Sequence, residues 1–191
     1  MDCLAVQSPR SMMEQGQALA SVRYRLAWID DVPAIVALVN AVYRGDSSRL
    51  GWTTEADLLD GQRTDAADVS QWVSAPESFF LLAEDDAGLL GCAHLNRDDD
   101  RACFGMFSIR PGSQGLGFGT ALLVEAETHV RQRWNVRSMR MCVISLRSEL
   151  IAYYERRGYA RIGKTAPFPT DTRFGTPKVG KLEFMVIEKG F

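Results

Sequence analysis

A glycine-rich turn separates a predicted strand from a long predicted helix near the middle of the chain. The apolar run Arg101–Ile109 predicts the strand, and Pro111 and Gly112 end it. Residues 114–120 form the turn, in which glycine occupies every second position from Gly115. Apolar side chains then recur at helical spacing as far as Trp134. A strand, a turn and a helix in this order predict a fold in which helices pack on a sheet.

Further apolar runs predict strands on both sides of this unit. They lie at residues 24–28, 79–83, 89–95, 138–144 and 182–187. A short acidic turn joins the strands at 79–83 and 89–95, and a second one joins 89–95 to Arg101–Ile109. These short connections predict an antiparallel meander. The last strand could lie at the edge of the sheet. Exposed edges pair with other chains, so this edge would allow a homodimer, although the oligomeric state stays open.

The helical signals complete the predicted architecture. Asp30 and Asp31 are suited to cap a first helix, whose apolar positions recur from Ile35 to Val42. The other predicted segments are a polar loop at 45–51, a short helix at 53–61, a helical turn at 68–72, a helix that ends at Gly158 and a long loop from Pro167. The order of elements predicts a mixed α/β sheet in a single domain.

Composition and charge exclude several classes of protein. The chain has 191 residues, of which 46% are hydrophobic, and this suits one soluble globular domain. Its formal net charge of -2 lacks the basic excess of nucleic-acid-binding proteins. No apolar run approaches the ~20 residues of a membrane helix, and the acidic N-terminus does not match a secretory signal. We therefore expect a cytoplasmic protein with no nucleic-acid or membrane partner, with residues 1–22 as a tail that could be flexible and residues 23–191 as the folded domain.

The cysteines and histidines show no metal-binding pattern. Cys3, Cys92, Cys103 and Cys142 are far apart in the sequence and form no CxxC pair. Three of them lie in apolar segments, where a free cysteine behaves as a small buried side chain. The two histidines are also far apart. We predict reduced cysteines, as in cytoplasmic proteins, and no metal site.

The glycine-rich turn has the properties of an anion-binding site. Small residues allow a ligand to approach the backbone, and the unpaired N–H groups of the following helix attract negative charge. A P-loop would need a lysine before a serine or threonine, and none is present. A dinucleotide fingerprint would need a third glycine where Thr120 stands. An ordinary turn with no ligand also fits these residues when they are taken alone.

The turn resembles the signature of the GNAT superfamily of N-acetyltransferases, which is Gln/Arg-x-x-Gly-x-Gly/Ala after a strand. The resemblance implies that backbone amides of this segment bind the pyrophosphate of acetyl-CoA. The residues concerned are Gln114, Gly115, Leu116, Gly117, Phe118, Gly119 and Thr120. It also implies that the preceding strand splays from its neighbour at a bulge, where backbone groups of Phe107 and Ile109 would pair with the pantetheine arm.

A second segment resembles the same family. Residues 153–159 are similar to its Phe-Tyr-x-x-x-Gly-Phe helix end, and Tyr154 holds the position of its usual general acid, four residues before Gly158. Arg147 stands where the family often has an asparagine. Together the two matches imply an acetyl-CoA-dependent N-acetyltransferase over residues 23–191. They also imply its fold, a mixed and mostly antiparallel sheet flanked by helices, with a splayed strand pair holding acetyl-CoA.

Acetyl transfer to an amine needs a base, an oxyanion donor and an acid. We predict Tyr154 as the acid, because a phenol with a pKa near ~10 stays protonated at neutral pH. A backbone N–H near Phe107 or Ser108 is suited to be the oxyanion donor. Glu55 is the predicted base, since early helices flank the acceptor pocket in this fold. His94 and a relay through water are the alternatives.

The acceptor is expected to be a primary amine of a small molecule. Acidic residues gather in the early part of the chain and would favour a cationic amine if several of them faced the pocket. They are Asp46, Glu55, Asp57, Asp60, Asp65 and Asp68. Two other functions stay open: a non-catalytic acyl-CoA-binding regulatory module, and an acetyltransferase that acts on proteins or peptides.

Overall fold

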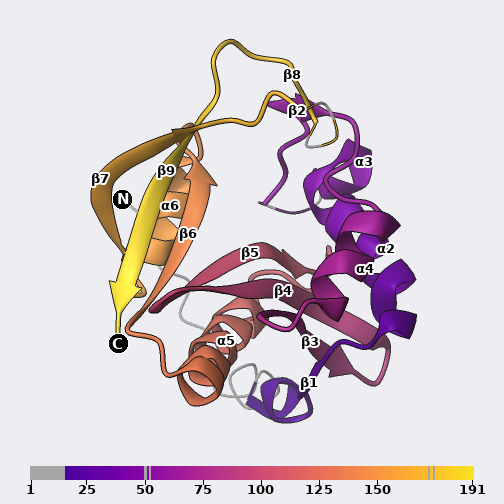
Figure 1. Cartoon of the computed structure of the whole chain (residues 1–191). Coiled ribbons are helices and arrows are strands. Elements are labelled where there is room, and N and C mark those ends of the chain that lie inside the picture. The colour runs from indigo at the N-terminus through magenta and orange to yellow at the C-terminus, as the bar shows by residue number, and fades with distance from the viewer. Residues whose placement is uncertain (1–15, 50, 52, 172, 174) are drawn as a thin grey trace, which may run out of the picture.

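A seven-stranded sheet forms the centre of the protein in the computed structural model, which describes residues 16–191 except 50, 52, 172 and 174 (Figure 1). The strands are β1 (Arg23–Leu26), β3 (Ser78–Asp85), β4 (Gly88–Asp98), β5 (Arg101–Ile109), β6 (Ser138–Ile144), β7 (Ala160–Pro167) and β9 (Glu183–Gly190). Their order is β1-β3-β4-β5-β6-β9-β7, and only β5 and β6 run parallel to each other. This arrangement confirms the predicted mixed and mostly antiparallel sheet.

Helices cover both faces of the sheet. They are η1 (Ile29–Asp31), α2 (Val32–Tyr43), α3 (Gly45–Ser48), α4 (Ala66–Ser74), α5 (Phe118–Trp134) and α6 (Ser148–Glu155). Side chains alternate along β3, so that Phe80 and Leu82 pack with α2 and α4, whereas Leu81 and Ala83 pack with α5 and α6. Within the described residues, no helix is long and apolar enough to cross a membrane.

Two short segments differ from the helical predictions. Gly45–Ser48 forms a helical turn where a polar loop was expected. The segment 53–61 forms turns and the short strand β2 (Leu59–Asp60) in place of a helix, because it pairs with the distant β8 (Thr176–Pro177). Of the predicted tail, residues 1–15 lie outside the described part of the chain. Residues 16–20 are helical, and Leu19 and Val22 pack against the core.

The expectation that the last strand forms an edge is wrong. Strand β9 lies between β6 and β7, and the edges of the sheet are β1 and β7. Strand β7 was not predicted, since most of its residues are exposed and Ile162 is its one large apolar side chain. The predicted homodimer is therefore no longer supported by an exposed β9 edge. The oligomeric state stays untested.

The sheet opens between β5 and β6. These strands pair only at Arg101–Cys103 with Ser138–Arg140, and Figure 1 shows β6, β9 and β7 turning away from β5 beyond that point. In the same stretch, β5 contains a bulge against β4, at which Met106 adopts a positive φ of 49°. The opening, which we call the strand cleft, confirms the splayed strand pair of the predicted fold.

A long loop joins β7 to β9. Its strand β8 pairs with β2, so that the two form a small second sheet at the end of the molecule opposite β1. Lys178 strengthens this contact, because its backbone N–H donates to the carbonyl of Leu58 at 2.9 Å. We call this feature the β2–β8 bridge. It brings Phe168 and Pro169 over the segment that contains Glu55.

Candidate active site

The glycine-rich turn adopts the geometry that its composition predicts. Gly115 and Gly117 have positive φ values of 81° and 90°, a backbone region in which a side chain would be strained. Gly117 is the N-cap of α5, so the unpaired N–H groups of this helix begin at the turn. A Cβ atom at Gly119 would lie 3.3 Å from the ring of Phe107, a tight contact that favours glycine at this position of the helix.

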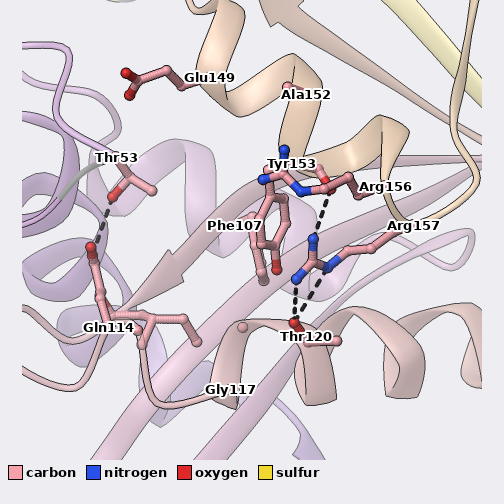
Figure 2. A pocket seen from close by; sticks show the side chains of 13 residues that line it. Thr53, Phe107, Gln114, Gly117, Thr120, Glu149, Ala152, Tyr153, Arg156 and Arg157 are labelled. Carbon is pink, nitrogen blue, oxygen red and sulfur yellow. Dashed lines mark hydrogen bonds between the residues drawn. The ribbon is translucent and has the colours of Figure 1, made fainter. Parts of the chain in front are cut away.

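The turn borders a cavity of about 660 Å³, which we call the glycine-loop cavity (Figure 2). Its lining includes most of the predicted cofactor residues: Phe107, Ile109, Gln114, Gly115, Gly117, Gly119 and Thr120. Leu116 and Phe118 are not part of the lining. The side chain of Leu116 is exposed, and that of Phe118 is buried in the core. These two residues could therefore contribute backbone groups only.

Two arginines at the end of α6 also line this cavity, and neither was predicted as a site residue from the sequence. Arg157 donates from Nη2 to the hydroxyl of Thr120 at 2.7 Å, and its guanidinium lies 3.5 Å from the ring centre of Tyr153. Arg156 lies beside it in the lining. Figure 2 shows Arg157 between α6 and the start of α5. Their positions in the sequence were the one indication of this role, because both arginines come directly before Gly158 in a segment that was already assigned to the site.

The backbone carbonyls assigned to a pantetheine arm already have hydrogen-bond partners. The hydroxyl of Tyr43 donates to the carbonyl of Phe107 at 2.7 Å, and Nε2 of Gln114 donates to that of Ile109 at 3.1 Å. Gln114 also donates to Thr53 at 3.2 Å, and it packs so closely on Gly51 that a Cβ there would lie 2.7 Å from its amide oxygen. The Gln114 side chain thus ties the turn to the early segment. A ligand would use the second lone pair of each carbonyl.

The strand cleft lies next to this cavity and contains the predicted acid. The cleft has a volume of about 60 Å³ and is lined in part by Tyr154, and Phe107 borders both the cleft and the glycine-loop cavity. Tyr154 is 4% exposed, and burial, followed by the nearby Tyr43, raises the pKa of its hydroxyl well above the usual value. The Tyr154 hydroxyl therefore keeps its proton at any physiological pH.

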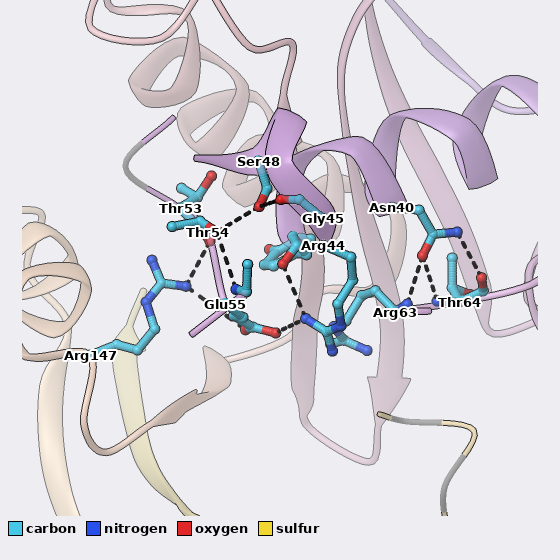
Figure 3. Close-up of polar contacts among 12 residues, drawn as sticks. Asn40, Arg44, Gly45, Ser48, Thr53, Thr54, Glu55, Arg63, Thr64 and Arg147 are labelled. Atoms are coloured by element: carbon cyan, nitrogen blue, oxygen red, sulfur yellow. Dashed lines mark hydrogen bonds and ion pairs between the residues drawn. The ribbon is translucent and has the colours of Figure 1, made fainter. Parts of the chain in front are cut away.

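Glu55, the predicted base, lies between two arginines on the other side of the cleft. Its Oε2 pairs with Arg44 at 2.5 Å, and its Oε1 lies 3.8 Å from Arg147. Figure 3 shows Arg147 and Arg44 on opposite sides of the carboxylate. Arg147 also donates to the carbonyl of Thr53 at 2.9 Å. Arg147, which stands where the family often has an asparagine, thus contacts the segment that carries Glu55.

A third cavity, of about 240 Å³, lies beyond the cleft, and we call it the distal pocket. Glu55 and Arg63 line both the cleft and this pocket, so the two spaces adjoin. His94 also lines it, with its ring stacked on Trp72 at 4.8 Å and its Nε2 2.8 Å from the hydroxyl of Ser78. Burial lowers the pKa of His94 to about 4, so this imidazole has little affinity for a proton at neutral pH.

The early acidic residues do not gather in the distal pocket. Glu55 is the one acid among the described residues that line it. Asp46, Asp57 and Asp60 have side chains that are 69% exposed or more. Asp65 caps α4 by accepting from the N–H of Asp68 at 2.9 Å. The expected acidic lining is therefore absent from the described part of this pocket.

A comparison with known families assigns the chain to a class of acyltransferases. Residues 34–159 match the model of the Acetyltransferase (GNAT) family. The protein belongs to this family, whose members use acetyl-CoA as the acyl donor, and it is an acetyl-CoA-dependent acyltransferase. No protein of curated function matches the chain in sequence.

Solved structures with the same fold include enzymes that act on different acceptors. A ribosomal-protein-alanine N-acetyltransferase from Brucella melitensis is 19% identical with a TM-score of 0.66, covering 88% of this chain and 99% of the other. A spermidine N-acetyltransferase chimera from Vibrio cholerae and hSSAT is 16% identical with a TM-score of 0.63, covering 89% and 95%. The PaiA N-acetyltransferase of Thermoplasma acidophilum, in complex with coenzyme A, is 17% identical with a TM-score of 0.62, covering 90% and 99%.

The residues of the glycine-loop cavity fit acetyl-CoA. The turn presents helix N–H groups with no side chain at Gly115, Gly117 or Gly119, and Arg156 and Arg157 supply positive charge for phosphates. The volume of about 660 Å³ lies within the range of ~300–1,000 Å³ typical of small-molecule sites. Among the described residues, no group of three or more His, Cys, Asp or Glu side chains is placed to hold a metal ion.

Proposed function

We propose that this protein transfers an acetyl group from acetyl-CoA to a primary amine of a small molecule by direct attack. The observation that carries the proposal is that three neighbouring spaces share lining residues. Phe107 lines both the glycine-loop cavity and the strand cleft, and Glu55 and Arg63 line both the cleft and the distal pocket. A donor held by the turn and an acceptor in the distal pocket would therefore meet beside Tyr154.

A covalent acetyl-enzyme is not needed in this arrangement. Cys142 is the one cysteine among the described residues that line the cleft, and desolvation raises the pKa of its thiol. A protonated thiol is a weak nucleophile, because the thiolate is the reactive form. This favours direct transfer between two molecules bound at the same time.

Tyr154 is the proposed acid. Acetyl-CoA supplies the acetyl group as an activated thioester. The Tyr154 hydroxyl, held protonated by burial, provides a proton within the cleft for the leaving sulfur. Neighbouring side chains fix the ring of Tyr154. The rings of Tyr153 and Tyr159 lie edge-on to it, with 5.2 Å and 5.8 Å between ring centres. The oxyanion donor is proposed to be a backbone N–H of the bulged strand β5, near Phe107 or Ser108.

Glu55 is the proposed base, acting directly or through water. We expect Glu55→Gln to lower kcat/KM at neutral pH about tenfold, below the ~100-fold typical of a dedicated base, because two arginines already compensate its charge. Asp57→Asn, which changes an exposed carboxylate in the same segment, should leave kcat/KM unchanged. A Glu55→Gln variant with the kcat/KM of the wild type would remove Glu55 from the mechanism.

The β2–β8 bridge supports a small-molecule acceptor over a protein. It brings Phe168 and Pro169 onto the distal pocket, whose volume of about 240 Å³ is below the ~300 Å³ at the lower end of typical ligand sites. Coenzyme A release should be measured with amino acids, polyamines, arylalkylamines and peptides. Turnover confined to peptides would favour a protein acetyltransferase. Acetyl-CoA binding without turnover on any amine would favour a non-catalytic acyl-CoA-binding module.

Arg157 is expected to contribute to acetyl-CoA binding. Removing its charge and its contacts with Thr120 and Tyr153 in Arg157→Ala should raise the acetyl-CoA Kd about tenfold, in line with one charge-assisted hydrogen bond. In Arg157→Ala the Kd should also depend less on salt concentration. Arg157→Lys keeps the positive charge and should therefore retain part of the salt dependence. Isothermal titration calorimetry measures both effects. Arg161→Ala removes an exposed arginine outside the cavity and serves as the control. Equal Kd values for the two alanine variants would contradict this role.

A further inference from the structure

The charged side chains around the distal pocket carry a net positive charge. Arg44 and Glu55 pair at 2.5 Å and offset each other, and His94 is uncharged at neutral pH because burial lowers its pKa to about 4. Arg63 remains, and Arg147 adds a further positive charge from the adjoining cleft. A substrate that carried only positive charge would be repelled from this space.

Arg63 has no carboxylate within 4 Å among the residues that the structure describes. Its guanidinium lies over the ring of Tyr43, 5.6 Å from the ring centre. Asn40 on α2 fixes the backbone beneath it, accepting from the N–H of Arg63 at 2.6 Å and donating to the carbonyl of Thr64 at 2.9 Å (Figure 3). The loop is thus anchored so that a guanidinium with no acidic partner borders the pocket.

The remaining walls of the distal pocket are aromatic and apolar. The ring of Trp72 stacks on His94, and Phe168 packs against Phe184 with 5.3 Å between ring centres. Leu59 is also part of the lining. An acceptor that fits this pocket must therefore combine an apolar group with a negatively charged group that can pair with Arg63.

We propose that the acceptor is a small primary amine that carries a carboxylate and an apolar group, as apolar amino acids do, and that Arg63 binds the carboxylate. This inference rests on the proposed function and specifies its substrate class. A guanidinium presents a fork of N–H donors that matches the two oxygens of a carboxylate. Arg63 would then be a specificity-determining residue that orients the amine toward the strand cleft.

The same positive charges help to prepare the amine for reaction. Nearby guanidinium groups disfavour an ammonium and favour the neutral amine, which has the lone pair needed for attack. The nitrogen forms its bond to the acetyl carbon as the carbon–sulfur bond breaks. The sulfur takes the Tyr154 proton, and the proton that the nitrogen loses restores the Tyr154 hydroxyl. The pocket thereby lessens the demand on Glu55 as a base.

Matched pairs of amines that differ only in the carboxylate test this proposal. Coenzyme A release should be measured with phenylalanine against phenethylamine and with leucine against 3-methylbutylamine, and spermidine serves as a cationic probe. We expect kcat/KM to be at least about tenfold higher for each amino acid, because a charged hydrogen bond supplies that difference. In Arg63→Met the ratio of the two kcat/KM values should fall to about one. In Arg63→Lys the ratio should lie between one and the wild-type value.

The ratio of two substrates on one preparation does not depend on how much of a variant is folded. Arg49→Met, which changes an exposed arginine outside the distal pocket, should preserve the wild-type ratio. Faster turnover of phenethylamine, 3-methylbutylamine or spermidine than of the amino acids would overturn the inference and leave the proposed function standing. An unchanged ratio in Arg63→Met would also overturn it. No turnover with any amine or peptide would overturn both.

Discussion

Replacing Tyr154 by phenylalanine should lower kcat by about 100-fold or more, which corresponds to roughly 3 kcal/mol of transition-state stabilisation. The variant keeps the buried ring and its contacts with Tyr153 and Tyr159, and it loses only the proton that the hydroxyl holds in the strand cleft. Steady-state coenzyme A release at saturating acetyl-CoA measures kcat, and calorimetry should give an unchanged acetyl-CoA Kd.

Tyr159→Phe is the matched control for this prediction. Tyr159 is equally buried, and its hydroxyl donates to Glu127 at 2.9 Å, away from the cleft. The control should lose some stability and keep its kcat. A kcat for Tyr154→Phe within twofold of the wild type would remove Tyr154 as the acid, and an equal loss in both variants would indicate a structural effect.

Removing Arg44 should strongly destabilise the fold. Arg44 and Glu55 are buried together, and Arg44→Met would leave the carboxylate buried without its main partner. Breaking a buried ion pair in this way costs about 3–5 kcal/mol of unfolding free energy. Chemical denaturation, with a constant slope against denaturant concentration, would measure the loss as a lower midpoint.

The double variant Arg44→Met/Glu55→Gln separates charge from packing. It removes the uncompensated carboxylate and should recover much of the stability that the single variant loses. Arg49→Met, at an exposed arginine that pairs with Asp57, should leave the midpoint unchanged. A single Arg44→Met variant as stable as the wild type would show that the pair is not needed for folding, for example because Arg147 replaces Arg44 beside Glu55.

Local signals predicted the parts of the site that local backbone chemistry determines. The glycines at 115 and 117 need positive φ values, and the segment before Gly158 ends a helix, so both features are visible in the sequence. The meander from β3 to β5 was predictable for the same reason, because short turns connect neighbouring strands. The roles assigned to Tyr154, Glu55 and the cofactor residues remain predictions.

Contacts between distant segments were not predictable in this way. The exposed strand β7 lacks an apolar pattern, and β2 exists only because it pairs with β8 more than 100 residues later. The pairing of Arg44 with Glu55 and the anchoring of Arg63 by Asn40 depend on how the early loops fold back on α2. The sequence therefore did not show whether the acidic residues at 46–68 face a pocket, and in the structure Glu55 is the one acid among the described residues that line the distal pocket.

The division of the sheet between β5 and β6 has a kinetic consequence. The glycine-loop cavity lies beside α5 and α6, whereas the distal pocket lies beside α2 and α4, on the other face of the sheet. With the donor and the acceptor proposed for these two sites, the reactants would approach the strand cleft from different faces of the sheet. We therefore expect no compulsory order of binding. Double-reciprocal plots should intersect, as expected for a ternary complex that assembles by either route.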